Sequence, residues 1–377
     1  MENELKDVNP EPSKPRQPEP QPETANDNAS NRDDRPLLKS DSKGMSTANI
    51  EDLEKKFAAF VRNDVYGTMG RGELPLAEKA LLGFALVTLL PIRVMLAMII
   101  LFFYYSVCRI CTLFSAPNRD VEEEQEDFAH MGGWSRAVIV RCGSFVSRVM
   151  LFLFGFYWIR ESYRILEQPQ NKSFTQNEGK DQSGVPERPG AIISNHVSYL
   201  DILYHMSSSF PSFVAKRSVG KLPLLGLISK CLGCVYVQRE SKSSDFKGVA
   251  EGTTTNGDFL LPFKTGAFLA GTPVLPVILR YPYQRFSPAW DSISGVRHVI
   301  FLLCQFINYI EVKRLPVYYP SQEEKDNPKL YASNVRWLMA REGDLVMSDI
   351  GLAEKRVYHA ALNGNNSLPS ILHQKDD

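Results

Sequence analysis

The sequence predicts an α/β domain, in which helices cover a sheet, preceded by helices that associate with a membrane. From Gly190 onward, short apolar strands alternate with helical segments, which is typical of α/β sheets. Residues 80–116, ahead of that domain, are the most apolar part of the chain. The 377 residues suffice for one large domain with accessory segments, and zero net charge argues against a general nucleic-acid-binding protein.

The N-terminal 48 residues are rich in Pro, Glu, Asp, Asn, Ser and Lys and have almost no apolar clusters. Such a segment buries too little surface to offset its ordering entropy, so residues 1–48 are predicted to be a disordered polar tail. Residues 49–79 are predicted to be an amphipathic helical segment. Within it, five apolar residues of 50–64 share one helical face: Ile50, Leu53, Phe57, Phe60 and Val61.

Residues 80–116 contain two apolar runs separated by Pro91 and Arg93. Each run is shorter than the roughly 20 residues that span a bilayer. Joined, they are long enough, but Arg93 would then lie near the bilayer centre, where a charge is costly. Two membrane arrangements fit these facts: a hairpin broken at Pro91 with Arg93 at the headgroups, or one tilted span. An ordinary buried core helix is the third possibility.

The next three segments are an acidic loop at 117–136, an interfacial hydrophobic helix at 137–167 and a polar linker at 168–189. The interfacial helix rests on the apolar run 149–159, which has Arg148 and Trp158 near its ends.

The main domain is predicted at residues 190–350, followed by a C-terminal tail at 351–377. Strands are expected at 191–194, 212–215, 235–238 and 274–280, and helices at 197–207, 222–231 and 328–341. The apolar run 299–310 fits a core helix or a helix dipping into lipid equally well.

The six cysteines argue against a disulfide framework, because four of them lie inside apolar runs. Two Cys-x2-Cys pairs, at 108/111 and 231/234, would have to converge to bind zinc. One pair lies in an apolar, membrane-like run, so no metal site is expected.

Four short motifs could carry chemistry. His196 follows a strand, and Asp201 is placed to hold its imidazole as a general base, although a helix start with a capping residue has the same pattern. Arg239 ends a strand and suits a phosphate, unless it makes an ordinary surface ion pair. Glu251-Gly252-Thr253-Thr254-Thr255 could cradle an anion or form a plain turn. The strand entry from Thr272 through Val277 could line an acyl pocket or the core.

Taken in this order, the four motifs resemble those of the glycerolipid acyltransferase family, which is also called the lysophosphatidic acid acyltransferase-like family. The family pattern is Asn-His-x4-Asp, then Gly-x-aliphatic-aromatic-aliphatic-x-Arg, then Phe-Pro-Glu-Gly-Thr, then aliphatic-Pro-aliphatic-aliphatic-Pro. The resemblance covers residues 186–285 approximately, and the conjunction is far more specific than any one motif. The runs Thr253–Asp258 and Phe263–Phe268 look like the plant lysophosphatidylethanolamine acyltransferases in particular.

The resemblance implies a mixed sheet covered by helices and transfer of an acyl group from acyl-CoA to a lysophospholipid hydroxyl. His196 would be the base and Asp201 its orienting carboxylate. Substrate-binding positions carried over from the motifs are Asn195, Gly233, Arg239, Glu251, Gly252, Thr253, Lys264 and Pro276. No metal or cofactor is expected beyond acyl-CoA as co-substrate, because a thioester is already activated. The expected partners are the lysophospholipid and the bilayer of the endoplasmic reticulum.

The chain departs from the family pattern between the second and third motifs. Val249-Ala250 replaces Phe-Pro, and only eleven residues separate Arg239 from Glu251. In the family a helix and a strand lie there, and a parallel crossover alone needs at least about 10–12 residues. An internal deletion near residue 249 is therefore expected. It leaves two hypotheses, an active lysophospholipid acyltransferase and a weakened or inactive isoform that acts as a non-enzymatic membrane protein.

Overall fold

The computed structural model describes residues 54–120, 125–164, 189–237 and 253–363. The predicted tail at 1–48 lies outside these residues, as do Arg239, Glu251 and Gly252.

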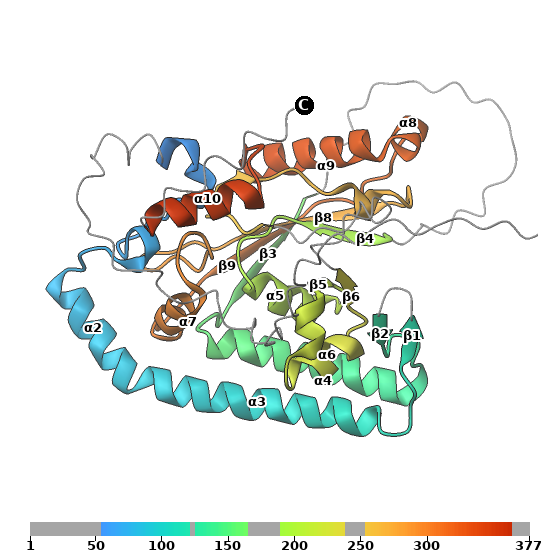
Figure 1. Ribbon diagram of the computed structural model, residues 1–377, viewed down its shortest axis with the longest axis horizontal. Helices are drawn as coiled ribbons and strands as arrows, with labels where there is room; N and C mark the ends of the chain where they lie inside the picture. Colours follow the sequence, from blue (N-terminus) through green and yellow to red (C-terminus); the bar gives the residue numbers. More distant parts are fainter. Residues whose placement is uncertain (1–53, 121–124, 165–188, 238–252, 364–377) are drawn as a thin grey trace, which may run out of the picture. The chain divides into compact units, whose positions relative to one another are not determined.

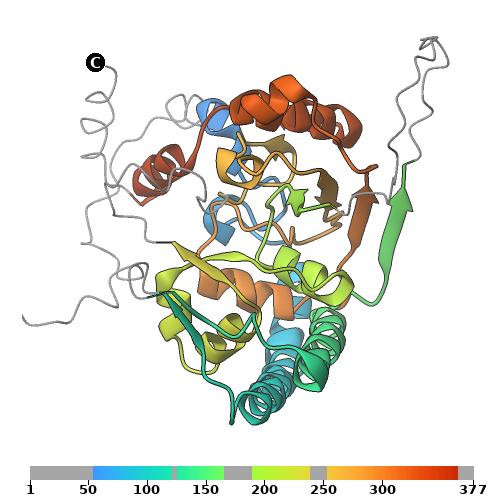
Figure 2. The same ribbon diagram turned by 90° about the vertical axis from the view of Figure 1, so that its right-hand side faces the viewer.

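The central sheet has the strand order β3-β9-β8-β4. Its strands are β3 (Ile159–Tyr163), β9 (Ile310–Arg314), β8 (Val274–Arg280) and β4 (Ala191–Ser194). β3 pairs parallel with β9 and β4 pairs parallel with β8, whereas β8 and β9 are antiparallel. The sheet is therefore mixed, and β3 lies at its outer edge beside β9 (Figure 2). The predicted α/β fold class is confirmed.

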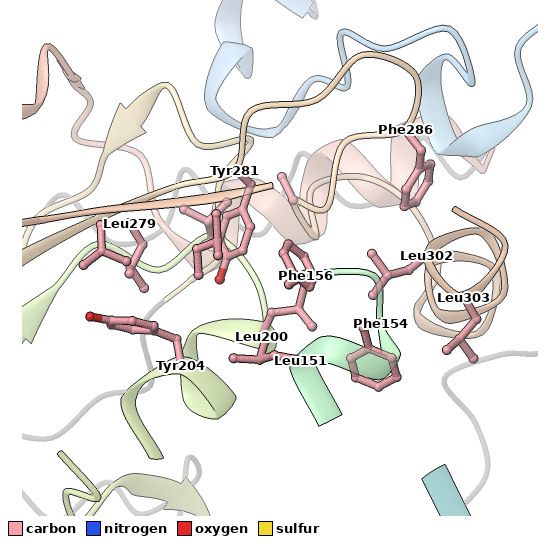
Figure 3. Packing of buried hydrophobic residues seen from close by; sticks show 14 of the residues in the cluster. Leu151, Phe154, Phe156, Leu200, Tyr204, Leu279, Tyr281, Phe286, Leu302 and Leu303 are labelled. Carbon is pink, nitrogen blue, oxygen red and sulfur yellow. The ribbon is translucent and has the colours of Figure 1, made fainter. Parts of the chain in front are cut away.

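Strand β8 is buried on both faces, because helices cover both sides of the sheet (Figure 1). On one face, Val274 and Ile278 pack with Val335 of α9 (Pro328–Gly343). On the other, Val277 and Leu279 pack with Leu200 of α5 (Leu200–Ser208), as Figure 3 shows for Leu279. The continuous apolar sequence of this strand is explained by this burial on two sides.

Three two-stranded sheets accompany the central one. β5 (Val214–Lys216) and β6 (Val235–Val237) pair parallel and flank α6 (Leu225–Cys231). β7 (Phe259–Leu260) pairs with β10 (Val346–Met347), and β1 (Asn118–Asp120) pairs with β2 (Gln125–Asp127) in the predicted acidic loop. Among the described residues, the hydrogen-bonded neighbour of β4 is β8, and β5–β6 is not joined to the central sheet.

The remaining elements are helices and short 3₁₀ turns. The helices are α2 (Leu76–Val87), α3 (Leu89–Cys111), α4 (Gly133–Leu153), α7 (Gly295–Leu303), α8 (Gln322–Asp326) and α10 (Leu352–Leu362). The 3₁₀ turns are η1 (Ala58–Phe60), η2 (Thr68–Gly70), η3 (Arg217–Lys221) and η4 (Thr265–Phe268).

The apolar segment breaks at Thr88, between α2 and α3, and not at Pro91 as predicted. Pro91 lies in the first turn of α3, where its missing N–H has no helical partner to lose. Arg93 is buried, and its Nη1 donates to the carbonyls of Leu303 (2.9 Å) and Gln305 (2.6 Å) at the end of α7. A cation is favourable at a helix C-terminus, so Arg93 ties α3 to α7.

Helix α3 is long and apolar enough to cross a membrane, the one such helix among the described residues. One side of it packs on α4, as Figure 1 shows. Its other side exposes large apolar side chains, among them Ile99, Phe102 and Phe103.

Three predicted helical segments differ in extent from the structure. The run 149–159 divides between α4, which ends at Leu153, and β3, which starts at Ile159. Gly155 takes a positive φ of 90° there, and Asn308 donates to the carbonyls of Phe154 and Gly155. The run 299–310 likewise divides between α7 and β9. The helix expected over 50–64 has left helical geometry at Val61.

The two Cys-x2-Cys pairs converge in one apolar cluster with Tyr104 and Ile139, which the sequence did not predict. All six cysteines are free thiols. Within the described part of the chain, no group of three or more His, Cys, Asp or Glu side chains is placed to hold a metal.

Candidate active site

The site is built on the turn between β4 and α5. Nδ1 of His196 lies 2.8 Å from Oδ2 of Asp201, which is in the first turn of α5. A carboxylate accepts hydrogen bonds, so Nδ1 is the donor of this pair, and in the neutral imidazole the lone pair then belongs to Nε2. The His196 side chain is 32% exposed and that of Asp201 is 6% exposed. A substrate can therefore approach the imidazole while the carboxylate stays shielded.

Asp201 is held by more than the histidine. Its Oδ2 also accepts the backbone N–H groups of Val197 (2.8 Å) and Ser198 (3.1 Å), and its Oδ1 accepts the hydroxyl of Tyr281 (2.6 Å). Asp201 also lies at the positive end of the α5 dipole. These donors hold the carboxylate in one orientation beside the imidazole.

Asn195 fixes the start of this turn. Its Nδ2 donates to the carbonyl of Leu279 (2.9 Å), and its Oδ1 accepts the N–H of the same residue (2.8 Å). The amide thus continues the β4–β8 pairing for one more step, and both of its polar groups are engaged by backbone. In this structure Asn195 positions His196 against the end of β8.

The described end of the third motif lies beside the histidine. The N–H of Thr255 donates to the carbonyl of His196 (3.1 Å). Lys355 of α10 donates from Nζ to the carbonyl (2.9 Å) and Oγ1 (2.7 Å) of Thr254 and to the carbonyl of Trp290 (3.0 Å). The C-terminal helix therefore holds this motif in place, whereas residues 351–377 are predicted from the sequence to be a tail.

The other predicted substrate-binding residues are more scattered. Thr253 precedes the two anchored threonines, and Pro276 is buried in β8 opposite Ile193. Lys264 is exposed at the start of η4. Gly233 has φ 69° in the turn before β6, where a Cβ would lie 2.8 Å from the Cβ of Ala129. Its conformation alone explains the glycine.

Sequence reasoning missed Tyr281, Lys355 and His205. Tyr281 lies one residue beyond the predicted strand 274–280, and Lys355 comes from an element that was not assigned to the domain. The four-residue spacing of His205 from Asp201 places both on one side of α5, which is a signal that could have been used.

Two buried histidines predict acid sensitivity. Burial lowers the pKa of His205 to about 4 and that of His298 to about 3. In the unfolded chain both titrate near 6.5, so between pH 6.5 and 4 the unfolded state binds more protons than the folded state. The free energy of unfolding should therefore fall as pH falls through this window, by on the order of 3 kcal/mol per histidine.

Thermal denaturation in detergent micelles from pH 7 to 4.5 measures this loss. His205→Phe should flatten the pH dependence, because it removes one of the two imidazoles that bind a proton as the chain unfolds. In the described part of the chain, Nε2 of His205 is buried and makes no hydrogen bond. An unchanged slope in that variant would contradict the assignment.

The arrangement can remove a proton from a hydroxyl group. His196 supplies the lone pair, Asp201 stabilises the imidazolium that forms, and the surrounding backbone fixes both. The four sequence motifs and this geometry point to the same chemistry.

Comparison with known proteins shows which sequences this chain resembles. Residues 176–280 match the family model described as Acyltransferase. The chain is 59% identical to lysophospholipid acyltransferase LPEAT1 of Arabidopsis thaliana, with all of both chains covered. That alignment extends over 414 positions, 37 more than the residues of this chain.

More distant relatives share part of their length with this chain. Lysophosphatidylcholine acyltransferase 1 of Homo sapiens is 30% identical over 72% of this chain and 50% of its own. Among solved structures, the 1-acyl-sn-glycerophosphate acyltransferase PlsC of Thermotoga maritima aligns with a TM-score of 0.36 and 16% identity. This alignment covers 68% of this chain and 100% of that one.

Proposed function

This chain belongs to the acyltransferase family that includes the lysophospholipid acyltransferases, and we propose that it transfers an acyl group from acyl-CoA to the free hydroxyl of a lysophospholipid. The observation that carries the proposal is the 2.8 Å contact between Nδ1 of His196 and Oδ2 of Asp201, with the imidazole partly exposed. Lysophosphatidylethanolamine is the proposed acceptor, in phospholipid synthesis and remodelling.

In the proposed reaction, Nε2 of His196 takes the proton of the acceptor hydroxyl. The oxygen attacks the thioester carbonyl, forming a C–O bond, and the tetrahedral intermediate then loses the CoA thiolate by breaking the C–S bond. The imidazolium returns its proton to that thiolate, so the base is regenerated. Asp201 stabilises the imidazolium through Nδ1–H throughout.

The phosphate of the acceptor is proposed to bind Arg239, with Glu251, Gly252 and Thr253 completing its site. The bond from Thr255 to the carbonyl of His196 supports this, because it brings the end of the third motif to the base. An anion held there would place the neighbouring glycerol hydroxyl near Nε2.

A membrane-associated enzyme fits both substrates, which carry long acyl chains. The exposed apolar side of α3 supports association with a bilayer, and Trp134 and Trp158 near the ends of α4 are exposed as interfacial anchors would be. We propose the endoplasmic reticulum membrane as the location, as the family resemblance implies.

Microsomes from cells expressing the chain, supplied with labelled oleoyl-CoA and a panel of lysophospholipids, test the function. We expect labelled diacyl phospholipid, most of all from lysophosphatidylethanolamine. LPEAT1 expressed in the same host is the positive control. Product no greater than that of His196→Ala microsomes with every acceptor would overturn the proposal.

The second candidate is a weakened or inactive deletion isoform. The 37 alignment positions without a residue in this chain favour it, as does the separation of β5–β6 from the edge strand β4 among the described residues. Full activity relative to LPEAT1 at equal protein level would exclude this candidate.

A further inference from the structure

Tyr281 stands directly after β8, with its ring in the main apolar cluster and 7% of its surface exposed. Its ring packs edge-on against Phe156, 5.9 Å between centroids. Figure 3 shows the Tyr281 hydroxyl pointing from the strand end toward the helix that begins with Leu200. That hydroxyl donates to Oδ1 of Asp201 at 2.6 Å.

The two carboxylate oxygens of Asp201 accept hydrogen bonds from different parts of the fold. Oδ2 receives His196 and two backbone N–H groups, all from the turn that carries the histidine. Oδ1 receives the Tyr281 hydroxyl, which comes from the neighbouring strand. Asp201 is 4% exposed, and a buried carboxylate oxygen without a donor is costly.

Tyr281 is well placed to remain a donor. Burial, together with the adjacent Asp201 carboxylate, raises its pKa well above the ordinary value, so the phenol keeps its proton at every pH at which the enzyme would work. Asn195 forms two hydrogen bonds with the backbone of Leu279, which lies two residues before Tyr281. These bonds fix the position of the end of β8 relative to the turn that carries His196. The pairing of β8 with the His196 turn therefore places the Tyr281 hydroxyl beside Oδ1 of Asp201.

We propose that Tyr281 is a positioning residue of the acyl transfer, which holds the Asp201 carboxylate in the orientation that supports His196. Tyr281 acts through Asp201 and touches neither substrate. The proposal deepens the acyltransferase function above and rests on it.

The test compares Tyr281→Phe with Tyr318→Phe. Tyr318 also donates to a buried carboxylate at 2.6 Å, that of Glu324, but at the opposite end of β8, next to Val274. Both variants lose one hydroxyl and one charge-assisted hydrogen bond. We expect kcat to fall about tenfold in Tyr281→Phe with KM unchanged, a typical effect of losing one hydrogen bond to a charged group. Tyr318→Phe should lower the melting temperature similarly and leave kcat alone.

A double-mutant cycle distinguishes positioning from a general structural role. In an Asp201→Asn background, adding Tyr281→Phe should change kcat no further, because the carboxylate through which it acts is gone. The same tenfold loss in both backgrounds, or a wild-type kcat in Tyr281→Phe, would overturn the proposal.

A readout that needs no acyl transfer keeps this inference separate from the proposed function. Diethyl pyrocarbonate modifies unprotonated imidazole, and peptide mass spectrometry follows His196 alone. Tyr281→Phe should change the modification rate in the same direction as Asp201→Asn, whereas Tyr318→Phe should not change it. A wild-type rate in Tyr281→Phe would refute the positioning role even if the chain proved to transfer no acyl group. If Tyr281→Phe alters the modification rate of His196 but the chain transfers no acyl group, only the proposed acyltransferase function is refuted.

Discussion

Replacing His196 by alanine should lower acyl transfer by about a thousandfold while leaving the protein folded. The imidazole makes its described side-chain hydrogen bond to Asp201 alone, and it is partly exposed, so its loss removes the base at little cost in packing. The Val197 and Ser198 N–H groups and the Tyr281 hydroxyl continue to hold the carboxylate. The rate of labelled phospholipid formation in microsomes measures the effect.

His130→Ala is the matched control, because His130 is an exposed histidine in a turn ahead of α4. It should retain wild-type activity at equal protein level. A His196→Ala variant that keeps more than a tenth of the wild-type rate would rule out His196 as the general base.

Restoring a helix and a strand at position 249 should raise both stability and activity. The edge of β4 away from β8 has no strand partner among the described residues, and β5–β6 lies apart from the central sheet. A strand inserted between them would form hydrogen bonds on both sides and cover apolar faces. A gain of about 3 kcal/mol would raise the melting temperature by roughly 10 °C for a domain of this size.

The insertion is taken from the corresponding segment of LPEAT1. The alignment with that relative contains 37 positions at which this chain has no residue. A glycine–serine insertion of equal length is the control and should restore neither property. Equal melting temperatures and equal acyltransferase rates for the natural chain and the LPEAT1 insertion would show that no strand is missing.

Local pattern predicted the buried strands well. The strands expected at 191–194 and 274–280 coincide with β4 and β8. A short apolar run bounded by glycine or proline is typical of a buried strand in an α/β domain. The His196–Asp201 pair was also predicted, since both residues belong to one short turn whose geometry is local.

Apolar runs near the helices were harder to interpret. The run 299–310 contains the end of α7 and the start of β9, and the run 149–159 divides between α4 and β3. Hydrophobicity alone does not separate a buried helix from a buried strand. The boundaries follow from contacts such as those of Asn308 with Phe154 and Gly155, which lie far apart from it in sequence.

The sequence by itself determined the α/β class, the pairing of His196 with Asp201 and the family, because each depends on residues close together in the chain or on motifs in a fixed order. Tertiary structure alone decided three hydrogen bonds. Arg93 donates to the carbonyl of Leu303 at the end of α7, Lys355 donates to Thr254 in the third motif, and Tyr281 donates to Oδ1 of Asp201. The physical reason is the same in all three cases. A buried polar group must find a partner, and the fold supplies it from segments that are distant in sequence.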